Sequence, residues 1–297
     1  MTGAEQGFLL LTSHLGDPDR KVLTVPQFRI LANAVSGGVL PNEDRELMAE
    51  DLMGLGFNRE SAQRILVLLS HKEQLQWYLE NAVRDGCLPV TRISSGYPLI
   101  LRKRLGLDSP GCLWLKGDPE LLQRPCIALV GSRQLRKDNL EFAREAGCEI
   151  AKQGFVLVSG NAKGADTVAQ EACLAAGGSV ISVVADCLAE HPGRDRVLYV
   201  SEDGFDLTFS SQRALSRNRV IHCLGEITLV AQCTFEKGGT WDGTTKNLRF
   251  GWSDVFCFRD GSSAFTELCQ RGANAVEVGA LRNLSGLLQN KFNRIEI

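Results

Sequence analysis

The stretch that decides the fold is FVLVSGNAKGADTVAQ, residues 155–170. It opens with four apolar residues typical of a short buried strand, which ends at Ser159 and Gly160. An alanine-rich helical pattern begins at Asp166. Because a helix N-terminus presents unpaired N–H groups and a partial positive charge, this order of strand, glycine loop and helix is typical of anion sites. The alternative is an ordinary turn before a well-capped helix.

Strands and helices alternate from residue 126 onward. We predict strands at 126–130, 155–158, 179–185, 226–231 and 254–258, and helices at 138–153, 164–176, 211–224 and 243–250. Strands rich in Val and Ile that alternate with helices indicate an α/β fold, with a mainly parallel, Rossmann-like sheet covered on both faces. In such sheets ligands bind at the carboxyl ends of strands, where the strand order reverses.

The first part of the chain has a different pattern. Residues 1–85 predict a small all-α domain, in which a helix ends at Gly56 and Asn58 caps the next one. A plain helical bundle is the alternative to a helix–hairpin–helix or SAM-like domain. Residues 86–125 contain several prolines and are expected to form a connecting segment, although CLWLKGD within it could be a strand. The core domain is expected to span residues 126–297.

The composition is that of an ordinary globular protein, with 44% hydrophobic and 23% charged residues. The net charge of −2 shows no overall basic excess, so any anion site must be local. No apolar run is long enough to span a membrane and no signal peptide is recognisable, so we expect a cytoplasmic protein. The ten cysteines form no C-x-x-C pair and are expected to be reduced thiols.

No catalytic constellation stands out. The four histidines have no metal-ligand spacing, and no nucleophile–base pair is visible. The sequence therefore favours a binding module over an enzyme, with no cofactor and no metal.

Two further motifs follow predicted strands. In VGSR, Gly131 allows a close backbone approach, and Arg133 offers a planar fork of donors suited to phosphate; a surface salt bridge is the alternative. In EKGGTWDGTTKN, residues 236–247, we expect a flexible, donor-rich loop that includes Gly239 and Thr240. A flexible surface loop without function is the alternative there.

Three arginines gather in QRALSRNRVIHCLGEITLV, residues 212–230. Arg213, Arg217 and Arg219 need anionic partners, which could be a bound phosphate or carboxylates such as Asp166 and Glu226. In the opening stretch, Lys163 supplies a mobile charge, and Asp166 is expected to cap the helix that it begins.

Together, residues 97–133, 158–184, 216–224 and 237–245 resemble the DprA/Smf DNA-processing family. The order of VGSR, SG-x-A-x-G-x-D and RNR carries the resemblance, which covers residues 97–275. It implies a protein that binds and protects incoming single-stranded DNA in natural transformation, helps to load a RecA-type recombinase and forms dimers. The resemblance does not include the winged helix that some members of the family carry at the C-terminal end.

The loops and the resemblance together give a set of expected DNA- or phosphate-binding residues: Gly131, Ser132, Arg133, Ser159, Gly160, Lys163, Gly164, Arg217, Asn218, Arg219, Gly239 and Thr240. Lys163 stands where the family usually has arginine, and the positions of Asn161, Gln170 and His191 depart from its pattern. Two alternatives use the same fold: a nucleotide-binding sensor and, less favoured, a nucleotide phosphoribohydrolase.

Overall fold

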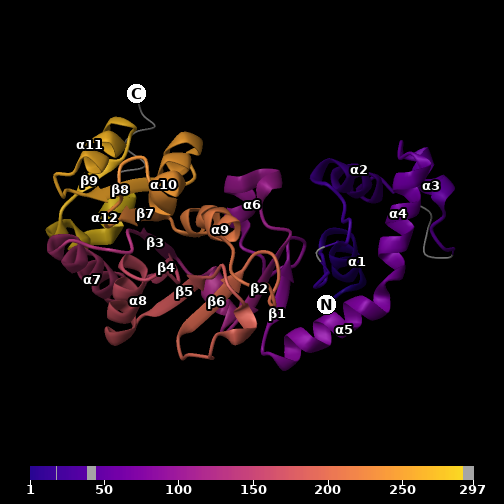
Figure 1. The fold of residues 1–297 in the computed structure, drawn as a ribbon, viewed down its shortest axis with the longest axis horizontal. Helices are drawn as coiled ribbons and strands as arrows, with labels where there is room; N and C mark the ends of the chain where they lie inside the picture. Colours follow the sequence, from indigo (N-terminus) through magenta and orange to yellow (C-terminus); the bar gives the residue numbers. More distant parts are fainter. Residues whose placement is uncertain (18, 39–44, 290–297) are drawn as a thin grey trace.

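The computed structural model describes residues 1–17, 19–38 and 45–289. Nine strands form one sheet, in the spatial order β1-β2-β6-β5-β4-β3-β7-β8-β9 (Figure 1). The strands are β1 Leu88–Thr91, β2 Cys112–Lys116, β3 Cys126–Val130, β4 Val156–Gly160, β5 Ser179–Val183, β6 Val197–Ser201, β7 Ile227–Val230, β8 Asp254–Phe258 and β9 Asn274–Val276. Strands β3 to β9 pair in parallel, whereas β1 and β2 join the β6 edge in antiparallel fashion.

The helices before the first strand are α1 Gly3–Thr12, α2 Val25–Ser36, α3 Ala49–Gly54, α4 Arg59–Ser70 and α5 Lys72–Arg84. Those that follow are α6 Leu99–Leu105, α7 Lys137–Lys152, α8 Ala165–Ala175, α9 Ser211–Leu224, α10 Gly238–Phe250, α11 Ser263–Gln270 and α12 Leu284–Gln289. The predicted Rossmann-like α/β architecture is confirmed.

The strand order reverses beside β3. From β3 the chain steps outward through β4, β5 and β6, and then α9 carries it back to β7 on the other side of β3. The carboxyl ends of β3, β4 and β7 therefore surround the point at which two crossovers diverge, which is where open α/β sheets bind ligands.

Helices cover both faces because side chains alternate along each buried strand. In β3, Ile127 and Leu129 pack into the apolar cluster that includes α7 and α8. Ala128 and Val130 point to the opposite face, where the cluster includes residues of α6, α9 and α11. All these side chains of β3 are buried, and burying one leucine contributes about 2 kcal/mol.

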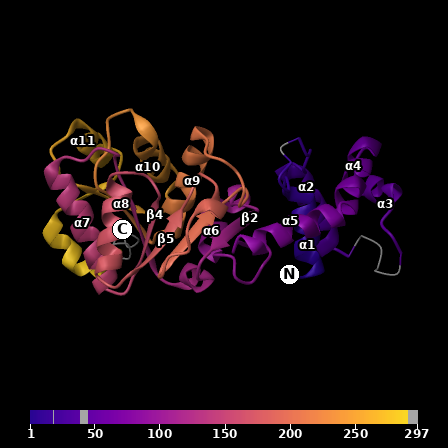
Figure 2. The same cartoon turned by 60° about the horizontal axis from the view of Figure 1, so that its bottom comes forward.

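The N-terminal helices form a cluster of their own and also contact the sheet. Leu31, Leu52 and Ile65 lie in a separate apolar core. Helix α5 leads back to the sheet (Figure 2), where the ring of Tyr78 packs edge-on against Trp114 of β2 at 5.4 Å between centroids. The prediction that Asn58 caps a helix is confirmed, because its Oδ1 accepts a hydrogen bond from the Ser61 amide of α4 at 2.8 Å.

Several element boundaries differ from the predictions. The sequence did not indicate β1, β6 or β9, of which β1 contains Pro89 and β9 has only three residues. Residues 86–125 contribute β1 and β2 to the sheet and therefore do more than connect two parts. The division of the chain into domains at residues 85 and 125 remains a proposal.

Two global features bear on the class of protein. All ten cysteines are free thiols. In the described ranges, no helix combines the length and the apolar character that a membrane span requires.

Candidate functional site

A cavity of about 460 Å³ lies at the switch point of the sheet. Its walls come from the loops after β3, β4 and β7 and from α9 and the start of α10. Loops that the sequence separates by as much as a hundred residues therefore meet in one place, as predicted from the rule for parallel sheets.

Two glycines let the loops after β3 and β4 touch. Gly164 has φ +89°, and a Cβ there would lie 2.5 Å from the carbonyl oxygens of both Ser132 and Arg133. A Cβ on Gly131 would overlap the side chain of Ala165. Only glycine fits either position, so the two loops form one continuous wall.

Arg217 comes closest to the predicted role. Its guanidinium lies against Gly160, where a Cβ would overlap both terminal nitrogens. Its Nε is buried and has no hydrogen-bond partner in the described part of the chain. Burial lowers the pKa of Arg217, and the carboxylate of Asp166 is the strongest opposing influence. The side chain thus places a positive charge in the cavity wall.

Asp166 is a buried acid rather than a cap on its own helix. Its Oδ2 accepts a hydrogen bond from the backbone N–H of Ala162, at 3.3 Å, which fixes the loop before α8. Burial raises the pKa of Asp166 to about 6, although the positive charge of Arg217 acts in the opposite direction. The expectation of a helix cap is therefore wrong, and the alternative of an arginine neighbour fits.

The other two arginines of the cluster face elsewhere. Residues two apart on a helix lie about 200° apart around its axis, so Arg219 points away from the cavity that Arg217 lines. Its Nη2 pairs with Glu202 at 2.7 Å, and its Nη1 donates to the Asp108 carbonyl. Arg213 donates to the carbonyls of Ala185, Leu207 and Thr208 and to Ser201 Oγ. Internal pairing, the alternative reading of this cluster, applies to Arg213 and Arg219.

The two predicted serines are engaged internally. Ser159 lies within β4, which runs two residues beyond the predicted end, and it is fully buried. Its Oγ accepts a hydrogen bond from Gln170 Nε2 at 2.6 Å, and the same nitrogen donates to the Gly160 carbonyl at 2.9 Å. Gln170 therefore holds the end of the strand. Ser132 donates both its N–H and its Oγ–H to the Gln232 carbonyl, at 2.9 and 3.2 Å.

The segment from 238 onward is a helix, not the flexible loop that was expected. Helix α10 begins at Gly238, so Gly239 and Thr240 lie in its first turn, beside the cavity. Thr240 Oγ1 donates to the Gly131 carbonyl at 3.0 Å, and Asn218 Nδ2 donates to the Gly239 carbonyl at 3.1 Å. These bonds tie α10 to the loop after β3 and to α9.

Two helix N-termini point toward the cavity without a side-chain cap. The residues at the N-cap positions of α8 and α10 are Gly164 and Lys237, and neither side chain caps its helix. The first N–H of α8, that of Ala165, donates to the Ser132 carbonyl, and the remaining first-turn N–H groups of the two helices are available to an anion. Arg133 and Lys163 add exposed positive charges, Arg133 in the cavity wall and Lys163 next to Ala162, which lines it.

Two further residues of the cavity were missed from the sequence. Phe209 lines the mouth and is 56% exposed, and His222 lines the wall and is buried. The signal for Phe209 was an aromatic residue just before the arginine-rich helix, but only the fold brings it beside Gly131. For His222, the sequence showed only an isolated histidine, with no motif that connects it to another residue.

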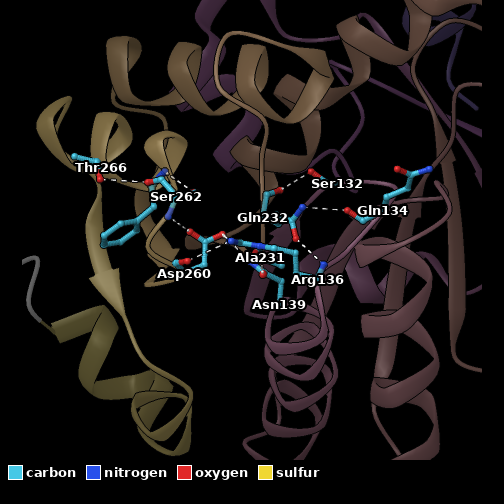
Figure 3. A network of polar contacts seen from close by, with 10 residues as sticks. Ser132, Gln134, Arg136, Asn139, Ala231, Gln232, Asp260, Ser262 and Thr266 are labelled. Atoms are coloured by element: carbon cyan, nitrogen blue, oxygen red, sulfur yellow. Dashed lines mark hydrogen bonds and ion pairs between the residues drawn. The ribbon is translucent and has the colours of Figure 1, made fainter.

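A polar network holds the loop that carries Arg133, as Figure 3 shows. Asn139 of α7 is buried, and its Nδ2 donates to the Ala231 carbonyl at 2.7 Å and to Asp260 Oδ2 at 2.9 Å. Arg136 forms an ion pair with the same carboxylate and donates from Nε to Asn139 Oδ1. The loop after β3 is thereby fastened to the ends of β7 and β8.

Gln232 completes this network from the loop after β7. Its Oε1 accepts a hydrogen bond from the Arg136 amide at 2.9 Å, and its Nε2 donates to the Gln134 carbonyl at 3.0 Å. The backbone on both sides of Arg133 is thus fixed, while the Arg133 side chain stays exposed.

The fold and this cavity define a Rossmann-like protein with a cationic site at the switch point of its sheet. The family model described as DNA recombination-mediator protein A matches residues 89–278, and the chain belongs to this family. The resemblance to the DprA/Smf proteins is thereby confirmed.

Curated relatives support the same assignment. DNA processing protein DprA of Streptococcus pneumoniae is 31% identical over 187 residues, which cover 58% of this chain and 65% of that protein. DprA of Bacillus subtilis is 30% identical over 200 residues, which cover 62% of this chain and 66% of the relative. The chain thus spans just under two thirds of the length of these relatives.

Solved structures share the fold. DprA of Streptococcus pneumoniae superposes with a TM-score of 0.70 at 24% identity, over 96% of this chain and 98% of the other. DprA of Helicobacter pylori, described for its single-stranded DNA binding mode, gives a TM-score of 0.56 at 23% identity, over 69% of this chain and 96% of the other.

Proposed function

We propose that this chain binds single-stranded DNA at the switch-point cavity, as a protein that processes and protects incoming strands. One observation carries the proposal. Arg133, Arg217 and two uncapped helix N-termini converge on a single cavity beside an exposed phenylalanine. Cationic donors for phosphates next to an aromatic platform for bases are what single-strand binding requires.

The role of each side chain in binding follows from how exposed it is. Arg133 and Lys163 are exposed and suited to backbone phosphates that pass the mouth of the cavity. Phe209 can stack on a base, which contributes about 1–3 kcal/mol per base. Arg217 lies deeper against Gly160 and adds a positive charge that the chain only partly balances with Asp166.

This binding would be local and sensitive to salt. The net charge of −2 gives no general attraction to nucleic acid, so affinity must come from the few cationic groups at the cavity. Each phosphate contact releases counterions, and affinity therefore falls as salt rises. The proposal includes no catalytic step, cofactor or metal.

Three finer parts of the proposal follow from the family alone. They are a role in natural transformation, the loading of a RecA-type recombinase, and a homodimer in the cytoplasm. Family membership supports them, and no contact among the described residues bears on them.

A nucleotide-binding sensor is the second candidate. The cavity volume of about 460 Å³ falls within the range of small-molecule sites, about 300–1,000 Å³. A nucleotide phosphoribohydrolase is less favoured, because Lys246 and Asn247 stand where a catalytic glutamate would be sought, and Asn247 is buried.

A single thermal-unfolding experiment distinguishes single-stranded DNA binding from nucleotide sensing. Unfolding temperatures are measured with a panel of mononucleotides and with oligo-dT, because a ligand that binds only the folded state stabilises it by RT ln(1 + [L]/Kd). Stabilisation by oligo-dT that salt abolishes supports strand binding. Stabilisation by a mononucleotide with no response to oligo-dT would instead identify a sensor.

A further inference from the structure

His222, in the cavity wall, has one ring nitrogen bound in the core and the other unpaired. Its Nδ1 lies 3.1 Å from Asn247 Nδ2 and 3.2 Å from Thr228 Oγ1. Its Nε2 has no hydrogen-bond partner within residues 1–17, 19–38 and 45–289. The residue is 1% exposed and still lines the cavity.

The network assigns the tautomer of this ring. Asn247 Oδ1 accepts a hydrogen bond from the Ser253 backbone N–H at 2.9 Å, which fixes the orientation of the amide. Its Nδ2 carries two hydrogens and faces Ser253 Oγ at 2.9 Å, His222 Nδ1 at 3.1 Å and Thr228 Oγ1 at 3.4 Å. We assign the two hydrogens to the two nearer acceptors, Ser253 Oγ and His222 Nδ1. A nitrogen that accepts cannot carry the proton in the neutral ring, so the proton lies on Nε2.

The ring stays neutral, and its Nε2 faces α10 at a glycine. Burial lowers the pKa of His222 to about 3, and the charge of Arg217 adds to this effect. Helix α10 presents Gly243 here, and a Cβ at that position would lie only 3.0 Å from Nε2. Glycine thus keeps side-chain atoms away from the unpaired N–H.

The surroundings suit a base better than a phosphate. Val130, Ala214 and Leu215 contribute apolar side chains to the same cavity. Phosphates are held by charged groups, whereas base edges are recognised by neutral donors and apolar contacts. Of the charged groups suited to phosphate, Arg133 and Lys163 are exposed, and Arg217 is half-buried near the carboxylate of Asp166. His222 is buried.

We propose that the cavity accepts one nucleobase from the bound strand and that His222 Nε2–H donates a hydrogen bond to a keto oxygen of that base. His222 is then a specificity-determining residue for bases such as thymine, and Asn247 is the residue that positions it. Adenine offers no such oxygen. The inference rests on the proposed binding of single-stranded DNA and adds a base preference to it.

The test compares two strands and three variants. Fluorescence anisotropy measures the affinities of oligo-dT and oligo-dA for the wild type, His222→Phe, Gly243→Ala and the exposed-histidine control His14→Phe. A neutral hydrogen bond contributes roughly a 3- to 10-fold preference. The dT/dA affinity ratio should fall by that factor in His222→Phe and Gly243→Ala and remain unchanged in the control. Stacking differences between the two bases cancel when ratios are compared.

Gly243→Ala keeps the test valid if His222→Phe fails to fold. It removes no hydrogen-bonding group of His222 or Asn247, places a methyl group 3.0 Å from the present position of Nε2, and replaces glycine by the best helix former. The second readout is the ¹⁵N spectrum of labelled histidine, where the Nε2–H signal of His222 should shift when oligo-dT is added.

The outcomes test the proposed function and the role of His222 separately. If the wild type binds neither oligonucleotide, the proposed function fails and this inference fails with it. If the wild type binds oligo-dT while its Nε2–H signal does not shift and the dT/dA ratio is the same in both variants as in the wild type, only the role of His222 is overturned.

Discussion

The guanidinium of Arg217 occupies the space in which residue 160 would otherwise carry a side chain. Gly160 ends β4 and Arg217 lies on α9, so this contact joins the end of a strand to the helix that crosses back over the sheet. The position of this cation therefore depends on a glycine 57 residues away in the sequence.

Gly160→Ala should displace Arg217 and weaken both stability and binding. A forced shift of this kind costs about 1–3 kcal/mol. Urea unfolding measures the stability, and oligo-dT anisotropy measures the binding. The matched control is Gly7→Ala in α1, where a Cβ meets nothing within 4 Å and alanine should stabilise the helix. Equal effects of the two substitutions would contradict the contact.

The buried carboxyl of Asp166 should make stability depend on pH. Its pKa of about 6 exceeds the ordinary value of 3.8, so the folded state holds the proton more tightly than the unfolded state does. The free energy of unfolding should therefore fall as pH rises from about 4 to about 6, by up to about 3 kcal/mol.

Asp166→Asn removes this titration. Urea unfolding at a series of pH values should show the decrease in the wild type and a flatter profile in the variant. Oligo-dT binding should also weaken on ionisation of Asp166 in the wild type, because a negative charge in the cavity wall then repels the phosphates of the strand. Identical pH profiles for the two proteins would rule out this role.

Asn139→Ala should loosen the loop that carries Arg133. The substitution leaves the buried Ala231 carbonyl without its donor and removes one of several donors to Asp260, and a single unsatisfied group costs about 1–3 kcal/mol. Hydrogen exchange should accelerate at residues 132–136, and urea stability should fall. Asn33→Ala, on an exposed face of α2, is the control; it should not accelerate this exchange or lower the stability, because alanine is the better helix former. Unchanged exchange at residues 132–136 would show that the network does not hold the loop.

Tyr78→Phe tests the link between α5 and the sheet. The hydroxyl donates to Asp206 Oδ1 at 2.7 Å, and its loss should lower the free energy of unfolding by about 1 kcal/mol, since Asp206 is exposed and water can replace the donor. Tyr199→Phe is the matched control, because Tyr199 stacks on His191 without a hydroxyl bond in the described structure. A larger loss at position 199 would contradict the assignment.

The sequence predicted most of the sheet because buried parallel strands are apolar runs with helices between them. It also predicted that the loops carrying Arg133 and Gly160 would meet Arg217, since carboxyl ends share one edge. It could not separate Arg217 from Arg219, because their directions depend on where α9 packs. Helix α10 was expected to start later, since its first turn is rich in glycine and threonine, which have low helix propensity, and packing overrides that preference.

His222 and Phe209 were beyond prediction for a different reason. Each becomes part of the site only through contacts with residues distant in the sequence, such as Asn247 for His222. A short motif carries no signal for such contacts.

The most direct test of the central claim reverses one charge at the cavity and one away from it. Arg133→Glu and Arg144→Glu change the same charge at exposed positions, Arg133 in the cavity wall and Arg144 on α7, where it pairs with Glu141. Oligo-dT affinity is measured by anisotropy at about 50 and about 200 mM salt. We predict that Arg133→Glu weakens binding at least about 10-fold at low salt and flattens the salt dependence, while Arg144→Glu matches the wild type. Equal affinities for the two variants would contradict binding at this cavity.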